Sequence, residues 1–363
     1  MTSITRPQVE TAIRGYIDPY LKQDLLAAKS IKDIRIDGGR VQVDVELGFP
    51  AKGYRDTLIA ELKSRIAALE GVTGVDVQVE WKIIAHEVQK GLRPIHEIKN
   101  IIAVASGKGG VGKSTTAVNL ALALAAEGAR VGVLDADIYG PSQPIMLGAH
   151  QRPETRDGKS LEPVMSHGLQ SMSIGYLIDE ETPMVWRGPM VTQALTQLLN
   201  DTRWSGLDYL VIDLPPGTGD IQLTLAQKVP VSGAIIVTTP QDIALLDARK
   251  GLKMFEKVQV PVLGIVENMS IHICSQCGHA EPIFGAGGGA RMAEQYGVPL
   301  LGELPLDIRI REEADSGRPT VVAEPDGPIA ARYREIARKA AAKLALQARD
   351  YSHKFPNIVI QKN

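Results

Sequence analysis

The sequence predicts an α/β protein in which a doubly wound, mainly parallel sheet follows a small α+β domain. From about residue 100 onward, short apolar runs alternate with helix-forming segments, which is typical of a parallel sheet covered on both faces. Before residue 85, the expected strands instead alternate apolar and polar residues, as half-buried strands do. We therefore expect a first domain at residues 1–85, a linker at 86–99 and a second domain at 100–363.

The first domain is expected to have the order helix–strand–strand–helix–strand, with an antiparallel sheet. Apolar spacing places these elements, in that order, at residues 8–28, 34–36, 41–47, 54–69 and 75–81. Asp18-Pro19 interrupts the first helical segment, and a turn at residues 37–39 joins the first two strands. The domain has no cysteine and no histidine before His86, so the sequence assigns no chemistry to it.

The second domain is expected to alternate apolar strands with helices. The strands are predicted at residues 101–105, 131–134, 209–212, 234–237, 262–266 and 300–301. Helices are predicted, among others, at residues 114–127, 244–256 and 288–296. The last long helix, residues 329–349, is rich in alanine and carries the basic residues Arg332, Arg334, Arg338 and Lys339. It has no Trp or Phe, so we expect a packed helix with a solvated basic side rather than a membrane-binding helix.

Composition and charge argue against several classes of partner. The chain of 363 residues is 44% hydrophobic and 23% charged, which is ordinary for a globular protein, and its net charge is −2. This balance gives no electrostatic basis for binding nucleic acid or an anionic membrane. No apolar run reaches membrane-spanning length, and the N-terminus lacks the apolar core of a signal peptide. We therefore expect a cytoplasmic protein with neither nucleic-acid nor membrane partners.

A glycine-rich loop between the strand at 101–105 and the following helix fits G-x-x-x-x-G-K-[ST], the phosphate-binding loop. It consists of Gly107, Lys108, Gly109, Gly110, Val111, Gly112, Lys113, Ser114 and Thr115. Glycines let backbone N–H groups converge on phosphate oxygens, and the helix N-terminus adds partial positive charge. Lys113 is expected to reach the outer phosphates and Ser114 to bind Mg²⁺. The loop predicts that the chain binds a nucleoside triphosphate.

The second lysine of the loop, Lys108, is not required by an ordinary phosphate-binding loop. The pattern G-K-G-G-V-G-K-S-T resembles the deviant loop of the ATPases that include the nitrogenase iron protein and the partition and septum-site ATPases. In that family the early lysine crosses a dimer interface onto the partner's nucleotide. The resemblance implies that Lys108 supplies positive charge to the transition state of hydrolysis.

Aspartates follow two of the predicted strands. Asp135 and Asp137 come directly after the strand at 131–134, and the resemblance implies that Asp137 positions the attacking water. Asp135 would then lie near Mg²⁺ through water. Asp213 closes the strand at 209–212, the Walker B arrangement in which the carboxylate holds the Mg²⁺ shell beside Ser114.

The strand at 262–266 leads into Asn268, which is a plausible contact for adenine. A guanine site typically needs an N-K-x-D element, and no aspartate follows here to bond the exocyclic amine of guanine. The sequence therefore favours ATP as the nucleotide.

Cys274 and Cys277, the only two cysteines, form a Cys-x-x-Cys pair. Such a pair directs two thiolates at one metal centre, but His272 and His279 are spaced too closely to it for known zinc sites. A homodimer would supply the missing ligands, because two pairs meeting across a two-fold axis give four thiolates. Four thiolates hold either Zn²⁺ or a [4Fe–4S] cluster, and the spacing alone does not choose between them.

The segments 268–270, 274–279 and 283–289 resemble the Mrp/ApbC family of iron–sulfur cluster carriers, as do residues 186–190 and 213–220. The first domain resembles the small iron–sulfur-assembly domain often fused ahead of these ATPases. The resemblance implies a homodimer that binds ATP and Mg²⁺, receives a [4Fe–4S] cluster at Cys274 and Cys277 and passes it to apo-proteins. The alternative is a positioning or partition-type ATPase with a structural zinc at the pair. An electron-transfer reductase is less consistent, because the nitrogenase iron protein uses widely separated cysteines.

Overall fold

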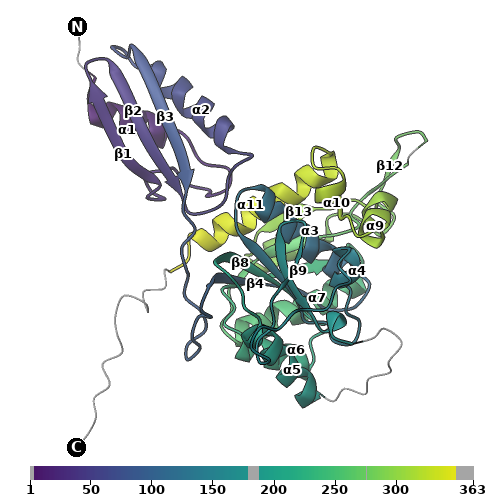
Figure 1. Ribbon diagram of the computed structural model, residues 1–363. Helices are drawn as coiled ribbons and strands as arrows, with labels where there is room; N and C mark the ends of the chain where they lie inside the picture. Colours follow the sequence, from purple (N-terminus) through teal and green to yellow (C-terminus); the bar gives the residue numbers. More distant parts are fainter. Residues whose placement is uncertain (1–3, 179–187, 275, 349–363) are drawn as a thin grey trace, which may run out of the picture.

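The computed structural model describes residues 4–178, 188–274 and 276–348, and these residues form three sheets (Figure 1). A three-stranded sheet lies near the N-terminus, an eight-stranded sheet forms the centre of the larger part, and a two-stranded hairpin projects from it. The predicted fold class is confirmed. No helix among the described residues has the length and apolar character needed to cross a membrane.

The N-terminal part has the predicted order of elements. These are α1 (Arg6–Arg14), β1 (Ile31–Asp37), β2 (Arg40–Leu47), α2 (Arg55–Ala67) and β3 (Gly74–Trp81). β1 and β2 form an antiparallel hairpin, but β3 runs parallel to β2. The prediction of an antiparallel sheet was therefore wrong for β3. The reason is that α2 is a crossover connection, which carries the chain back to the start of the sheet before β3 begins.

The predicted helix at 8–28 ends early, at Arg14. Two aspartate side chains account for the turns that replace its second half. Asp18 Oδ1 accepts hydrogen bonds from the next N–H groups, those of Tyr20 and Leu21, at 2.8 and 2.9 Å. Asp24 Oδ1 accepts two more from residues 26 and 27. Such side-chain bonds stabilise turns at the expense of helix.

The large sheet has the strand order β13-β10-β9-β4-β8-β5-β7-β6, and the only antiparallel pair among its described strands is β6–β7. Its strands are β4 (Ile98–Ser106), β5 (Val131–Asp135), β6 (Val164–Ser166), β7 (Leu169–Ser173), β8 (Leu207–Asp213), β9 (Gly233–Thr238), β10 (Val262–Glu267) and β13 (Leu300–Glu303). The sequence did not predict β6 and β7. The strand before the glycine-rich loop also begins earlier than predicted, inside the expected linker.

That early start depends on two polar residues whose side chains are satisfied within the fold. Lys99 Nζ pairs with Asp208 at 2.7 Å, and the buried Asn100 donates to the carbonyl oxygen of Ile84 at 2.8 Å. Polar residues at the start of a strand are easily assigned to a linker from the sequence alone, because the partners that satisfy them lie far away along the chain.

Helices cover both faces of this sheet. They are α3 (Lys113–Ala126), α4 (Gln143–Met146), α5 (Gly188–Asp201), α6 (Asp220–Lys228), α7 (Asp242–Lys257), α8 (Gly288–Tyr296), α9 (Ile308–Asp315), α10 (Thr320–Ala323) and α11 (Pro328–Ala345), with a short 3₁₀ turn at Ile174–Tyr176. α3 packs against α11, and α7 packs against α8. Because crossovers between parallel strands are right-handed, these two pairs are expected on opposite faces of the sheet. The central strands are parallel, so their carboxyl ends meet at one edge.

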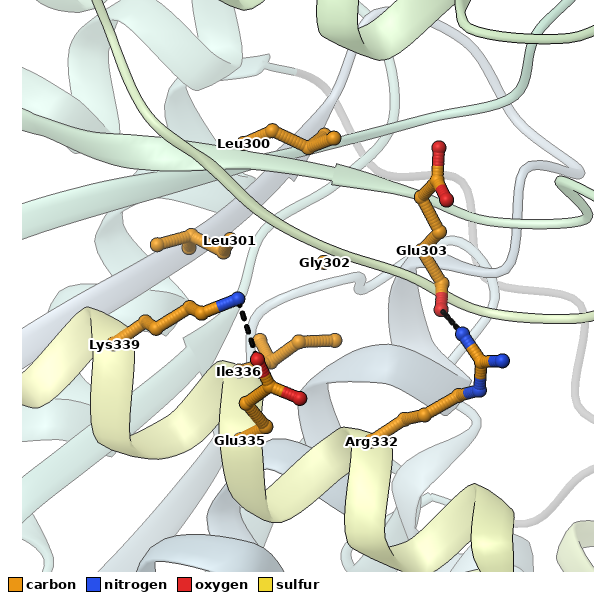
Figure 2. A pocket seen from close by; sticks show the side chains of 8 residues that line it. All are labelled: Leu300, Leu301, Gly302, Glu303, Arg332, Glu335, Ile336 and Lys339. Atoms are coloured by element: carbon orange, nitrogen blue, oxygen red, sulfur yellow. Dashed lines mark hydrogen bonds and ion pairs between the residues drawn. The ribbon is translucent and has the colours of Figure 1, made fainter. Parts of the chain in front are cut away.

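α11 is packed, as predicted, but its basic residues are not simply solvated. A pocket of about 280 Å³ lies between α11 and the edge strand β13. Figure 2 shows the side chains that line it. Arg332 there donates to the carbonyl oxygen of Glu303 at 3.1 Å, and Lys339 pairs with Glu335 at 2.7 Å. Arg334 donates to the carbonyl oxygen of Pro325.

The N-terminal part contacts the far end of α3, the helix that follows the glycine-rich loop. Glu127, at the C-terminus of α3, is 1% exposed and accepts a hydrogen bond from the N–H of Gly53 at 2.8 Å. Arg338 of α11 donates to the same carboxylate at 3.1 Å and lies over the ring of Tyr20. One buried carboxylate therefore joins α3, α11 and the loop before α2.

Replacing Glu127 by alanine is expected to lower the free energy of unfolding by about 3 kcal/mol, because it leaves Arg338 without its buried partner. Urea unfolding followed by circular dichroism measures this. Glu10→Ala is the matched control, since the Arg6–Glu10 pair is exposed and should contribute less than about 0.5 kcal/mol. Equal changes in the two variants would contradict this account of the contact.

Candidate functional site

The glycine-rich loop connects β4 to α3 at the carboxyl edge of the sheet. It therefore lies between a strand and a helix, as the sequence motif requires. At Gly107, an added Cβ would overlap the backbone of Asp247 in α7, so only glycine fits there. Gly112 has φ of 80° and caps α3, and an added Cβ there would overlap the side-chain amide of Asn268. Close packing therefore explains why the loop needs these two glycines.

Lys113, the first residue of α3, points into the site and is only 6% exposed. Its ammonium forms an ion pair with the carboxylate of Asp213, at the end of β8. Nζ also lies 3.2 Å from Ser114 Oγ and 4.0 Å from Asp137 Oδ2. The structure thus brings three other predicted site residues, Ser114, Asp137 and Asp213, to the ammonium group of Lys113.

The site holds three carboxylates but only one ammonium group, that of Lys113, which pairs with Asp213 and lies 4.0 Å from Asp137. Asp135 and Asp213 are fully buried, and Asp137 is partly buried. Burial and the neighbouring Asp213 carboxylate raise the pKa of Asp135 to about 7. Burial raises the pKa of Asp137 too; the Lys113 ammonium opposes this rise and Asp213 adds to it. The site therefore has an excess of negative charge and oxygen ligands, which fits Mg²⁺.

Asp135 has a second role, which the sequence did not predict: it anchors the loop that carries Asp137. Four donors bond to its carboxylate at 3.0–3.1 Å, namely the backbone N–H groups of Asp137, Ser142 and Gln143 and the hydroxyl of Ser173. These donors favour the ionised carboxylate, but burial and the charge of Asp213 outweigh them. A water-mediated position near Mg²⁺ stays a prediction.

The raised pKa of Asp135 predicts a pH dependence of stability in the protein without nucleotide or metal. Its contribution is fully present below the unfolded value of about 4 and is lost as pH rises through about 7. Between pH 5 and 8, the wild type should therefore lose roughly 2–3 kcal/mol of unfolding free energy relative to Asp135→Asn. Denaturant unfolding at both pH values measures this difference, and parallel pH profiles would contradict it.

Two further predicted residues belong to the loop or contact it: Lys108 is part of it, and Asn268 bonds to it. Lys108 is half-buried, and within the described ranges its ammonium has no ion-pair partner. Asn268 Nδ2 donates to the carbonyl oxygen of Val111 at 2.9 Å, so in this structure its side chain holds the backbone of the loop. Its contact with adenine, and the action of Lys108 across a dimer, stay predictions.

Gln143, on α4, is a residue at this site that the sequence analysis missed. It is 1% exposed, and its Nε2 donates to Asp213 Oδ2 at 3.0 Å and to the carbonyl oxygen of Ser114 at 3.2 Å. No sequence signal could have identified it, because a glutamine after a Pro-Ser turn belongs to no motif.

The cysteine pair lies in the turn of a hairpin formed by β11 (His272–Ile273) and β12 (Ala280–Glu281). The Cys274 N–H donates to the carbonyl oxygen of His279, and the Gly278 N–H donates to that of Cys274, both at 2.9 Å. Cys274 is half-buried and Cys277 is exposed. The strands are too short to be predicted from the sequence.

Cys274 is in surroundings that favour a thiolate. The backbone N–H of Cys277, and then that of Gln276, point at the Cys274 sulfur, and with the Cys277 side chain and His272 they lower the pKa of the thiol. His272 Nδ1 is hydrogen-bonded to the carbonyl oxygen of Leu306, 3.1 Å away. Among the segments that resemble the Mrp/ApbC family, residues 186–187 and residue 275 lie outside the described residues.

Two family models match the chain. One, described as NUBPL iron-transfer P-loop NTPase, matches residues 97–341, and the other, described as iron-sulfur cluster assembly protein, matches residues 6–79. Among solved structures, a nucleotide-binding protein from Archaeoglobus fulgidus in complex with ADP is similar. Its TM-score is 0.56 and its identity 39%, and the match covers 64% of this chain and 90% of that chain.

Curated relatives agree with these models. An iron-sulfur cluster carrier protein from Salmonella typhimurium is 53% identical over 343 residues, which are 94% of this chain and 93% of that protein. An iron-sulfur cluster carrier protein from Pseudomonas fragi is 62% identical over 278 residues, 76% of this chain and 97% of that protein. The chain therefore belongs to the iron–sulfur cluster carrier family of P-loop NTPases.

Proposed function

We propose that two copies of this chain hold one [4Fe–4S] cluster between them and deliver it to apo-proteins, in a cycle coupled to ATP hydrolysis. The observation that carries this proposal is the Cys274–Cys277 pair at the tip of a projecting hairpin. Each chain has no further cysteine, so one chain offers two of the four thiolates that a cluster requires. A two-fold dimer supplies the other two.

The hairpin suits a cluster that is carried and then released. The turn is held by its own hydrogen bonds, and the lowered pKa of the Cys274 thiol favours the thiolate, which is the form that binds a cluster. Exposure of Cys277 leaves the bound cluster open to attack by the thiolates of an acceptor protein. A buried structural site would lack this access.

At the nucleotide site, we propose that Lys113 exchanges its partner when ATP binds. Its ammonium now neutralises Asp213, and the outer phosphates of ATP would take over that role. Asp213 and Ser114 would then hold Mg²⁺, which would supply positive charge to the phosphates. Asp137, 4.0 Å from Lys113 Nζ, would position the attacking water.

Three further assignments belong to this proposal. Lys108 would stabilise the transition state on the partner's nucleotide, since its ammonium is not engaged within the described part of its own chain. Asn268 would contact adenine, and the ADP bound by the Archaeoglobus relative supports an adenine nucleotide. The division into residues 1–85, 86–99 and 100–363 also remains a proposal, with no cluster ligand in the first part because it has no cysteine.

Anaerobic reconstitution with iron and sulfide, followed by mixing with an apo-enzyme that needs a [4Fe–4S] cluster, tests the function. We expect a brown protein that restores the activity of the apo-enzyme faster than free iron and sulfide do. A colourless, zinc-binding protein that restores no activity would support a positioning ATPase with a structural zinc instead. The names of the relatives do not favour that alternative.

A further inference from the structure

We propose that Gln143 is a positioning residue for the magnesium shell of the nucleotide site. The inference rests on the proposed use of Mg²⁺ with the nucleotide and adds a residue that no motif of the loop or of the Walker B strand contains. Gln143 begins α4, directly after the loop anchored by Asp135, and it is 1% exposed.

The side-chain amide of Gln143 joins the two residues expected to bind the metal. Nε2 donates to Asp213 Oδ2 at 3.0 Å and to the carbonyl oxygen of Ser114 at 3.2 Å. Both partners are acceptors, so the nitrogen of the amide must be the atom that faces them. Gln143 thereby fixes one oxygen of the Asp213 carboxylate relative to Ser114, whose hydroxyl is expected to bind the metal.

The other atom of the amide is unsatisfied. Gln143 Oε1 is buried and has no hydrogen-bond partner among the described residues. Burying an acceptor without a partner destabilises the fold, so a donor that reaches Oε1 would be favourable. A water molecule bound to Mg²⁺ would be such a donor, because this cation usually keeps several of its waters in protein sites.

Gln143 also explains how Asp213 can stay oriented through the cycle. Lys113 and Gln143 bond to different oxygens of that carboxylate. When Lys113 moves to the phosphates, the bond from Gln143 remains and keeps Asp213 directed at the metal. Loss of Gln143 should therefore weaken the metal's contribution to binding and leave the contacts between the loop and the phosphates intact.

The test is the ratio of the affinities for a fluorescent ADP analogue with saturating Mg²⁺ and with EDTA, measured by anisotropy on the full chain. Gln143→Met keeps the length of the side chain but removes both polar atoms. We expect the gain in affinity from Mg²⁺ to fall about tenfold in this variant, which corresponds to the loss of one hydrogen bond to a charged group. Its affinity in EDTA should stay within about twofold of the wild type.

Gln89→Met is the matched control. Gln89 is also buried, and its amide donates to the carbonyl oxygens of Ala226 and Val229, away from the carboxylates. It should keep the full gain from Mg²⁺. An unchanged ratio in Gln143→Met, or an equal loss of affinity with and without Mg²⁺, would overturn the proposal. A wild type that gains nothing from Mg²⁺ would overturn the proposed use of the metal as well, whereas failure of cluster delivery alone would leave the role of Gln143 standing.

Discussion

Replacing both Cys274 and Cys277 by serine is expected to abolish cluster binding while nucleotide affinity stays within about twofold of the wild type. Serine keeps the size of the side chain and the backbone hydrogen bonds of the turn, which involve only main-chain atoms. It removes the thiolates, and a hydroxyl is a poor ligand for iron in a cluster. Iron and sulfide content after anaerobic reconstitution measures the loss, and nucleotide titration measures what is retained.

His279→Ala provides the matched control for the hairpin. His279 is exposed, lies in the same turn and contributes its backbone carbonyl rather than its side chain to the hydrogen bond with Cys274. This variant should bind as much iron as the wild type. If the double serine variant retained the full iron content, the cluster would have to be bound elsewhere, and the proposed site would be wrong.

Lys108→Ala is expected to slow ATP hydrolysis by at least a hundredfold with little change in nucleotide affinity. A cation that arrives from a partner subunit stabilises mainly the charge that develops in the transition state, and such residues contribute 10³ or more in comparable sites. Binding should be retained because the proposed phosphate contacts come from Lys113 and the backbone of the loop. Steady-state hydrolysis and equilibrium nucleotide binding separate the two effects.

Mixed dimers test whether Lys108 acts on the partner's nucleotide. A chain with Lys108→Ala keeps Asp137, and a chain with Asp137→Ala keeps Lys108. If Lys108 acts across the interface, a mixture of these two inactive chains regains about one quarter of wild-type activity, because half of the dimers are mixed and each has one complete site. No recovery on mixing would show that Lys108 acts within its own chain.

The parts of the site that were predictable from the sequence are local in the chain. The glycine-rich loop, Lys113 and Ser114 are contiguous, and Asp213 ends an apolar strand, so spacing and strand pattern identify them without knowledge of the fold. The parallel sheet was predictable for a related reason. Strands buried on both faces have near-continuous apolar sequences, and β4, β5, β8, β9 and β10 show this pattern.

The parts that were missed depend on contacts between distant segments. Gln143 is significant only because α4 brings it to Asp213, 70 residues further along the chain. The parallel direction of β3 depends on where α2 packs, and the hairpin around the cysteines has strands of two residues each. Asp18 reads as a helix interruption, but its bonds to the following N–H groups replace helix with turns. None of these features leaves a periodic signal.

The most direct test of the account is the mass of the anaerobically reconstituted protein measured by native mass spectrometry. We expect a mass that corresponds to two chains with a single [4Fe–4S] cluster. After the cluster is transferred or chelated, we expect the mass of two chains without iron or sulfide. A complete cluster on a monomer, or a dimer with one separate metal centre on each chain, would contradict the sharing of a cluster between two cysteine pairs.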